Sequence, residues 1–332
     1  MAILSSELKF YKSAVVDSTT ANGGRMSNNL ITSGVVQNVF PNVLAAERVA
    51  GSTTYRKLFL KVANDADLPL INPQLWLDVV TAADDWVTLF AGTQTDTVAS
   101  IGTPRMYGCG TLKTSVSVGG SALVVTVEDA SIAGMFVNGD TIRITDKATA
   151  AAITGNEQIM TISGTPAVSG NDVTITTTET LAEAYAGGAA RVMSVYAPSD
   201  VECSSSNWVE TTAIGTYDED VYPVICDNIG SIEQTWTLTF VDATNFTVSG
   251  NTVGALASGT RGTDYSPNNP AFTKPYFTLE SAGFGGTWTN GQTIVFQTHP
   301  AAIPVWEKRV VPAGAASLSG NSTTLVVAGE SA

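Results

Sequence analysis

The feature that most constrains this chain is its apolar pattern, which alternates every second residue over short runs and holds no long helical period. Runs at 57–62, 75–80 and 86–90 are rich in β-branched and aromatic residues and are bounded by Asn, Asp or Pro turns. Such runs are typical of strands, whereas a long amphipathic helix would repeat every 3.6 residues. The sequence therefore predicts an all-β fold made of many short strands.

Residues 111–196 differ in texture from the rest of the chain. Bulky aromatic residues are scarce there, and Val, Ile and Thr alternate with polar residues at period two. We expect strands at 140–145, 158–162 and 172–176, and a helical turn at 180–185. This segment is predicted to form a compact β domain of its own.

The two flanks of this segment share an aromatic-rich texture. We expect residues 1–110 and 197–332 to form one discontinuous main domain of the β-sandwich type, with the small β domain of residues 111–196 inserted in it. Insertion at a loop tip costs little when the ends of the inserted domain lie close together. The predicted architecture is therefore one main domain and one insertion.

Charge narrows the classes of partner. Asp and Glu number 30 against 16 Lys and Arg, so the formal net charge is -14. A surface so poor in cations neutralises few phosphates, which disfavours specific nucleic-acid binding. An acidic surface that lines a conduit would still allow DNA to pass without adhering.

Cysteine usage and hydropathy exclude two further classes. Cys109, Cys203 and Cys226 are odd in number and have no CxxC spacing, which predicts neither a disulfide framework nor a thiolate metal site. No apolar run reaches 18 uncharged residues, and the N-terminus lacks the pattern of a signal peptide. We expect a reducing compartment and no membrane insertion.

The search for catalytic motifs centres on the single histidine, His299, which precedes Pro300. One histidine cannot form a multi-histidine metal site, and no GxSxG nucleophile elbow is present, so a loop residue is expected. No phosphate-binding GxxxxGK[ST] loop occurs, and Gly283–Gly286 has the wrong spacing for a dinucleotide fold. We expect no catalytic, cofactor-binding or metal-binding residues, no cofactor and no enzymatic activity.

Acidic clusters leave two alternatives open. Asp218–Asp220, with Asp227 nearby, and Asp84–Asp85 are candidates for acid and base catalysis in a glycan depolymerase or for Ca²⁺ binding. The run Asn64–Asp67 lacks the glycine and terminal glutamate of an EF-hand loop. For Asn64–Asp67 a solvated turn is the favoured interpretation, and for Asp218–Asp220 it is an exposed loop whose like charges repel neighbours and set subunit register.

Six tryptophans suggest either a sugar-stacking platform or the anchors of a β-sandwich core. Trp76, Trp236 and Trp288 lie in alternating strand contexts, which favours the core for these three. Trp306 precedes three charged residues and is a candidate for an interface. The remaining two are Trp86 and Trp208.

Several segments resemble the structural proteins of tailed bacteriophages. Phe277–Phe296, rich in Gly and Thr, and Ile303–Pro312 look like virion proteins of such phages. The opening residues Ser6–Lys12, together with Asn22–Met26, resemble structural proteins encoded near the tail genes of Mu-like and siphovirus-type phages. No functional residue is carried over by this resemblance.

The resemblance implies a virion protein that assembles in the host cytoplasm. The expected function is a tail component, either a tail-tube or a baseplate-ring subunit, that self-assembles through strand edges and loops. Its expected partners are copies of itself and other virion proteins, with passive passage of DNA. The alternatives are a capsid decoration or minor capsid protein, and a tail protein that binds a receptor or glycan through exposed tryptophans.

Overall fold

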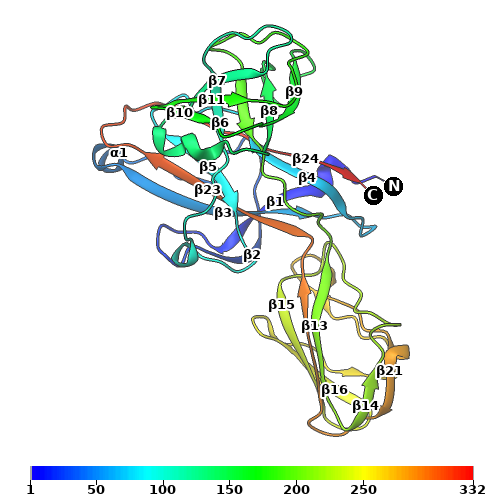
Figure 1. Ribbon diagram of the computed structural model, residues 1–332. Helices are drawn as coiled ribbons and strands as arrows, with labels where there is room; N and C mark the ends of the chain where they lie inside the picture. The colour runs from blue at the N-terminus through cyan, green and yellow to red at the C-terminus, as the bar shows by residue number, and fades with distance from the viewer. Residues whose placement is uncertain (1, 332) are drawn as a thin grey trace.

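The computed structural model describes residues 2–331, which fold almost entirely into antiparallel β-sheets and confirm the all-β prediction. Three groups of strands lie in a row (Figure 1). We call them the central unit (residues 2–107, 196–202 and 300–331), the barrel unit (108–195) and the distal unit (203–299). Within the described residues the helical elements are short: α1 (Ala45–Ala50), η1 (Ser5–Glu7), η2 (Val98–Ser100), η3 (Ala130–Met135) and η4 (Ser281–Gly283).

The central unit packs a five-stranded sheet against a two-stranded one. The larger sheet has the order β2 (Gly23–Leu30), β1 (Leu8–Val15), β3 (Ser52–Val62), β23 (Ala302–Val311) and β5 (Trp86–Ala91). The smaller sheet pairs β4 (Leu70–Leu77) with β24 (Leu325–Ser331). Leu60, Leu75 and Val305 belong to the apolar cluster that joins the two sheets. Ile3 N donates to Ser331 Oγ at 3.0 Å, so the two ends of the described chain lie side by side (Figure 1).

The barrel unit is a single curled sheet of seven strands. Their order is β10 (Ala167–Ser169), β11 (Asp172–Thr176), β7 (Ala122–Thr126), β6 (Cys109–Leu112), β12 (Arg191–Ser194), β8 (Thr141–Thr145) and β9 (Glu157–Thr161). Alternation places Val173 and Ile175 of β11 inside while their neighbours face outward. Ile162, just after β9, bridges Thr177, just after β11, so the sheet closes on itself and leaves little free edge.

The distal unit has an aromatic core between a larger and two small sheets. The larger sheet has the order β13 (Ser204–Thr211), β22 (Thr293–His299), β15 (Gln234–Phe240), β16 (Asn245–Gly250) and β17 (Gly254–Ala255), with β18 (Gly259–Thr260) also paired to β16. The small sheets are β14 (Ile214–Tyr217) with β21 (Phe284–Thr287), and β19 (Asn268–Asn269) with β20 (Lys274–Pro275). Phe240 and Trp288 stack with ring centroids 4.1 Å apart in this core.

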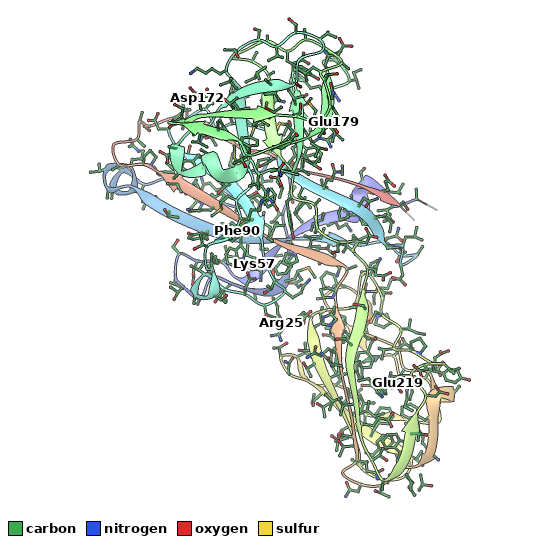
Figure 2. The ribbon with its side chains drawn as sticks, in the orientation of Figure 1. Arg25, Lys57, Phe90, Asp172, Glu179 and Glu219 are labelled. Carbon is green, nitrogen blue, oxygen red and sulfur yellow. The ribbon has the colours of Figure 1, made fainter. Side chains whose placement is uncertain are left out.

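The C-terminal third of the chain divides between two cores. Strands β23 and β24 join the first third in the central unit, whereas residues 204–299 build the sheets and the apolar cluster of the distal unit. The proposed folding domains, 1–110 with 197–332 around 111–196, stay a prediction. Figure 2 places Lys57 and Phe90 in the central unit, Asp172 and Glu179 in the barrel unit and Glu219 in the distal unit.

Most strands expected from the alternating pattern are present. The three runs expected in the barrel unit correspond to β8, β9 and β11 within one residue at each end. The run expected at 75–80 is β4, which begins at Leu70 and ends at Leu77. The helical turn expected at 180–185 is wrong, because this stretch is irregular and Tyr185 bridges Val116 across the barrel.

Candidate functional site

A row of three polar side chains crosses the outer face of the distal sheet. Strand alternation buries Trp236 and Phe296 on one face, which leaves Ser206, His299 and Glu233 on the other. His299 Nε2 lies 2.8 Å from Ser206 Oγ, and His299 Nδ1 lies 2.8 Å from Glu233 Oε2. The expectation of a loop histidine is wrong, because His299 is the last residue of β22.

A second row runs beside the first. Asn207 has a left-handed backbone (φ 55°) within an irregularity of β13 between Ser206 and Val209, and there its carboxamide Nδ2 donates to Gln297 Oε1 at 2.8 Å. Gln297 Nε2 donates in turn to Thr235 Oγ1 at 3.3 Å. Asn tolerates positive φ better than most residues, so the bulge is accommodated at small cost. It brings Asn207 onto the same face as the serine.

Ser206, His299 and Glu233 stand in the order of a nucleophile, a base and a group that orients the base. The histidine side chain is 31% exposed and the glutamate side chain 17%, so the row is reachable from solvent yet held in place. Sequence reasoning missed it because the partners lie 93 and 66 residues from His299 along the chain. Only the register of β13, β22 and β15 brings them together.

The turn at Asn64–Asp67 connects the central unit to the distal unit through hydrogen bonds. Asn64 Oδ1 accepts the backbone N–H groups of Ala66 and Leu68, which closes the turn. Asp67 Oδ1 accepts Asn228 N of the distal unit at 2.7 Å. Burial raises the pKa of Asp67, against the effect of that hydrogen bond. The turn therefore serves the junction of the central and distal units.

The other acidic clusters hold loops in place. Asp85 is buried, which raises the pKa of its carboxyl, and Oδ1 accepts Asn321 Nδ2 at 2.6 Å. Asp227 Oδ1 accepts two backbone N–H groups at 2.8 Å, and Asp218 Oδ1 accepts Val221 N at 3.3 Å. Among residues 2–331, no three His, Cys, Asp or Glu side chains are grouped so that they could hold a metal ion.

None of the six tryptophans is an exposed platform. Trp76, Trp86, Trp236, Trp288 and Trp306 are buried, and Trp208 is half-buried against Phe296 at a centroid distance of 5.4 Å. Trp306, a candidate for an interface, is instead fully buried inside the central unit. Its Nε1 donates to Asp96 Oδ2 at 2.8 Å. The charged residues after Trp306 belong to a strand in the middle of the sheet.

The cysteines are free thiols. Cys109 is buried, and Cys203 and Cys226 are half-buried neighbours at the junction of the central and distal units. The Cys203 thiol donates a hydrogen bond to Cys226. This bond, together with burial, raises the pKa of Cys203, and it is the main cause of the lowered pKa of Cys226. All three cysteines belong to or pack against the apolar clusters of the central and distal units.

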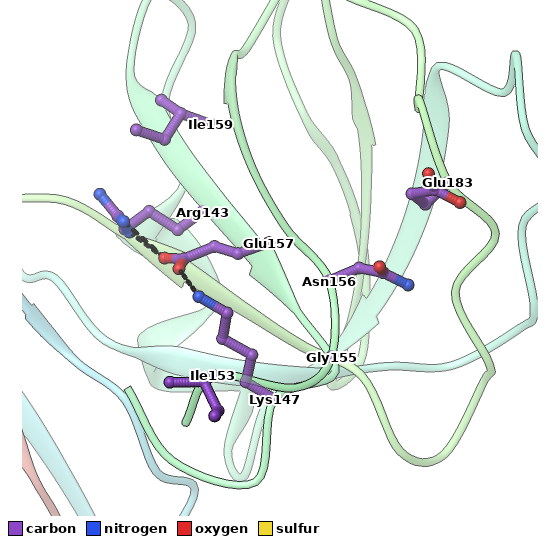
Figure 3. Close-up of a pocket in the computed structure, with 8 residues that line it drawn as sticks. All are labelled: Arg143, Lys147, Ile153, Gly155, Asn156, Glu157, Ile159 and Glu183. Carbon is purple, nitrogen blue, oxygen red and sulfur yellow. Dashed lines mark hydrogen bonds and ion pairs between the residues drawn. The ribbon is translucent and has the colours of Figure 1, made fainter. Parts of the chain in front are cut away.

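A solvent-open hollow of about 480 Å³ lies in the barrel unit. Glu157 accepts hydrogen bonds from Arg143 Nε at 2.8 Å and from Lys147 Nζ at 3.0 Å (Figure 3). Burial opposes ionisation of Glu157, but these bonds outweigh it and lower the pKa of Glu157. Three of the charged side chains that line the hollow, Arg143, Lys147 and Glu157, are thus paired with one another, while the exposed Glu183 also lines it.

Residues 31–50 form the most unusual surface of the chain, and we call them the arm. None of these residues is fully buried, and four large apolar side chains are mostly exposed: Val35 is 55% exposed, Val36 83%, Leu44 64% and Val49 76%. Apart from α1 the arm is irregular. The arm begins at Ile31, whose N–H donates to Phe10 O of β1 at 2.7 Å, and it ends with α1, which lies at the end of the central unit opposite the two chain ends (Figure 1). Long irregular segments of this kind are usually functional.

Comparisons with known protein families, curated proteins and solved structures found no match to this chain. No helix within residues 2–331 is both long enough and apolar enough to cross a bilayer. The functional proposals below therefore rest on the residues themselves.

Proposed function

We propose that this protein is a structural subunit of a tailed-phage virion, a tail component of the tube or baseplate-ring type. Copies assemble through the arm and through open strand edges, and the finished virion is where the protein resides. The single observation that carries the proposal is the arm, a 20-residue segment in which no side chain is fully buried and Val35, Val36, Leu44 and Val49 are more than half exposed, although Ile31 and Val39 pack against the central core. A subunit that is completed by its neighbours accounts for such a surface.

The charge of the arm favours a second copy of the chain as its partner. Residues 31–46 contain no charged side chain, whereas the whole chain carries a net charge of -14. Two copies repel one another over most of their surfaces, and this repulsion is smallest where charge is absent. The neutral apolar arm is therefore the region where like subunits meet at the least electrostatic cost.

The middle of the arm is held in place by two arginines. Arg56 Nε donates to Val39 O at 3.2 Å, and Arg309 Nη1 donates to Pro41 O at 2.9 Å. The Arg309 guanidinium also lies 4.8 Å from the ring centroid of Phe40. A surface that is already ordered loses less conformational entropy on binding. The arm is thus presented to a partner in a defined shape.

Open strand edges offer the complementary surface. Among the described residues, β13 pairs only with β22, and β24 pairs only with β4. Unpaired edges template pairing with an extended segment of another chain. Contacts between two different surfaces of identical subunits generate rings or filaments, which is the geometry of a tail tube or baseplate ring. An acidic lumen would let DNA pass without adhering.

The test compares assembly of the wild type with that of Val35→Ser/Val36→Ser by light scattering after gel filtration and by negative-stain electron microscopy. We expect rings or larger oligomers for the wild type and monomers for the arm variant. Val118→Ser is the matched control, because Val118 is a 62% exposed valine in the barrel unit, and it should assemble as the wild type does. A wild type that stays monomeric at high concentration, without rings, contradicts the proposal.

Position in the particle has its own test. Immunogold labelling of purified virions against this chain should mark the tail. Gold confined to the capsid would instead identify a decoration or minor capsid protein.

A further inference from the structure

We propose that Ser206, His299, Glu233 and Asn207 form an acyl-transfer site on the outer face of the distal sheet, with short-chain carboxylic esters as its substrate class. This activity goes beyond the assembly role. It uses side chains on the outer face of the distal sheet, whereas assembly uses the arm of the central unit and the free backbone edge of β13, the strand that also carries Ser206. The inference rests on four side chains brought to one face by three strands.

The relay of hydrogen bonds has the geometry that nucleophilic catalysis requires. In a neutral His299 with the proton on Nδ1, the Nδ1–H group donates to Glu233 Oε2 and Nε2 accepts from Ser206 Oγ, each across 2.8 Å. Glu233 is the positioning residue, because it holds the tautomer and the ring plane. Nε2 is then free of any other role and can take the serine proton.

Asn207 supplies a donor for the oxygen that becomes negative. One N–H of its Nδ2 group donates to Gln297 Oε1 at 2.8 Å. Among residues 2–331 no second acceptor binds this group, so the other N–H is available beside the serine. The Gln297 contact holds the carboxamide in place, and its bond to Thr235 holds Gln297. A fixed amide donor at this position stabilises a tetrahedral oxyanion.

The backbone at this point supports the assignment. Ser206 precedes a residue with φ 55° in an irregularity of the edge strand β13, so the regular ladder stops directly after the serine. Bulges of this kind occur next to active sites because they redirect a side chain. The redirected side chain here is Asn207, which reaches the face of Ser206.

The open sheet face determines the substrate class. Ser206 lies half-buried on the edge strand β13, between the exposed residues Ser205 and Asn207. Acetyl and similarly short acyl groups can meet the serine there without a channel for a long acyl chain. The acyl group is therefore expected to be small and the alcohol portion exposed to solvent.

The chemistry balances without a cofactor. Ser206 Oγ attacks the ester carbonyl carbon while its proton passes to His299 Nε2. The C–O bond to the alcohol then breaks, and the alcohol leaves with that proton. Water attacks the acyl-serine with its proton taken by His299, the carboxylic acid leaves, and the serine recovers its proton.

The first experiment treats the full-length protein with an alkyl fluorophosphonate. Oγ forms a bond to phosphorus, fluoride leaves, and the serine proton is released through His299. We expect one label per chain, located on Ser206 by peptide mass spectrometry, and p-nitrophenyl acetate hydrolysis that Ser206→Ala reduces to the rate of the denatured protein. Ser205→Ala, a change at the neighbouring exposed serine of the same strand, should retain label and rate.

Two further variants separate catalysis from folding. Asn207→Ala should lower the hydrolysis rate by about 100-fold with labelling stoichiometry unchanged. Glu233→Ala should lower the labelling rate, and Glu233→Gln, which keeps an acceptor for Nδ1–H, should restore part of it. Circular dichroism shows whether each variant is folded. Absence of label in the folded wild type, or label on a residue other than Ser206, overturns the proposal, and neither result bears on whether the arm drives assembly.

Discussion

Lys57 and Asp96 form an ion pair inside the central unit, with Nζ 2.6 Å from Oδ1 and the lysine side chain fully buried. Lys57 Nζ also donates to Gly24 O at 2.6 Å, and Asp96 Oδ2 accepts the indole N–H of Trp306. Burial lowers the pKa of Lys57, and the bond to Asp96 partly restores it. The pair thus ties the loop that carries Asp96 to the central strands β3 and β23.

The first prediction follows from this pair. Asp96→Asn keeps a hydrogen-bond acceptor for Trp306 but leaves the Lys57 charge buried without a counter-ion. We expect the free energy of unfolding to fall by about 3 to 5 kcal/mol, measured by urea titration. Asp65→Asn is the control. The Asp65–Lys274 pair is largely exposed, so its loss should lower the free energy of unfolding by less than about 1 kcal/mol. Equal losses in both variants would contradict this reading.

A second prediction concerns Lys61, which is buried, donates to Ile229 O and lies 3.7 Å from the ring centroid of Phe272. Burial lowers the pKa of Lys61 to about 7, so the unfolded chain binds more protons than the folded one between about pH 7 and 10.5. The Lys61 contribution to stability therefore rises with pH across that window. In urea titrations at pH 6.5 and 9.5, Lys61→Met should reduce the increase in the free energy of unfolding between the two pH values. Lys9→Met changes an exposed lysine that lies opposite Lys61 in the β1–β3 pair, and it should leave most of that increase in place.

Glu307 leads to a pH dependence of the opposite sign. Burial raises the pKa of Glu307 to about 7, so the folded chain binds the extra proton between about pH 4.5 and 7. Its contribution is fully present below pH 4.5 and is lost as the pH rises through 7. Glu307→Gln should stabilise the protein at pH 7.5 by roughly 2 to 3 kcal/mol and change little at pH 4.5. If the exposed control Glu183→Gln showed the same pH-dependent gain, burial of Glu307 would not be the cause.

The junction of the central and distal units depends on Asn228, which is fully buried. Its Nδ2 donates to Leu68 O at 3.1 Å, and its Oδ1 accepts Cys203 N at 3.1 Å. Asn228→Ala leaves both backbone groups without their partner, which we expect to cost about 2 to 4 kcal/mol. Hydrogen exchange should become faster at residues 66–70 and 202–204. Asn251→Ala, which removes one exposed bond to Thr235 N, should leave exchange at the junction unchanged.

The same junction shows where local pattern stops being informative. Asn64–Asp67 was expected to be a solvated turn, and the turn itself forms through Asn64 Oδ1. Its contacts with Asn228 and Lys274 lie more than 150 residues away along the chain, so no local pattern announces them. Short-range hydrogen bonding made the turn predictable, whereas its contacts with the distal unit depend on how the two units pack.

From the sequence alone, period-two alternation determined that the chain is all-β and where strands such as 141–145 and 172–176 lie. It does so because one face of a strand packs against the core and the other contacts water. Only the tertiary structure decided which strands pair. The pairing of β23 with β3, the closure at Ile162 and Thr177, and the meeting of Ser206 with His299 all join distant segments. The prediction for Trp306 was wrong for the same reason. Its charged neighbours indicated a surface position, but they belong to β23, which lies between β3 and β5 inside the sheet. Register and burial are properties of the folded whole, and they are selected by side-chain packing between segments that the sequence keeps far apart.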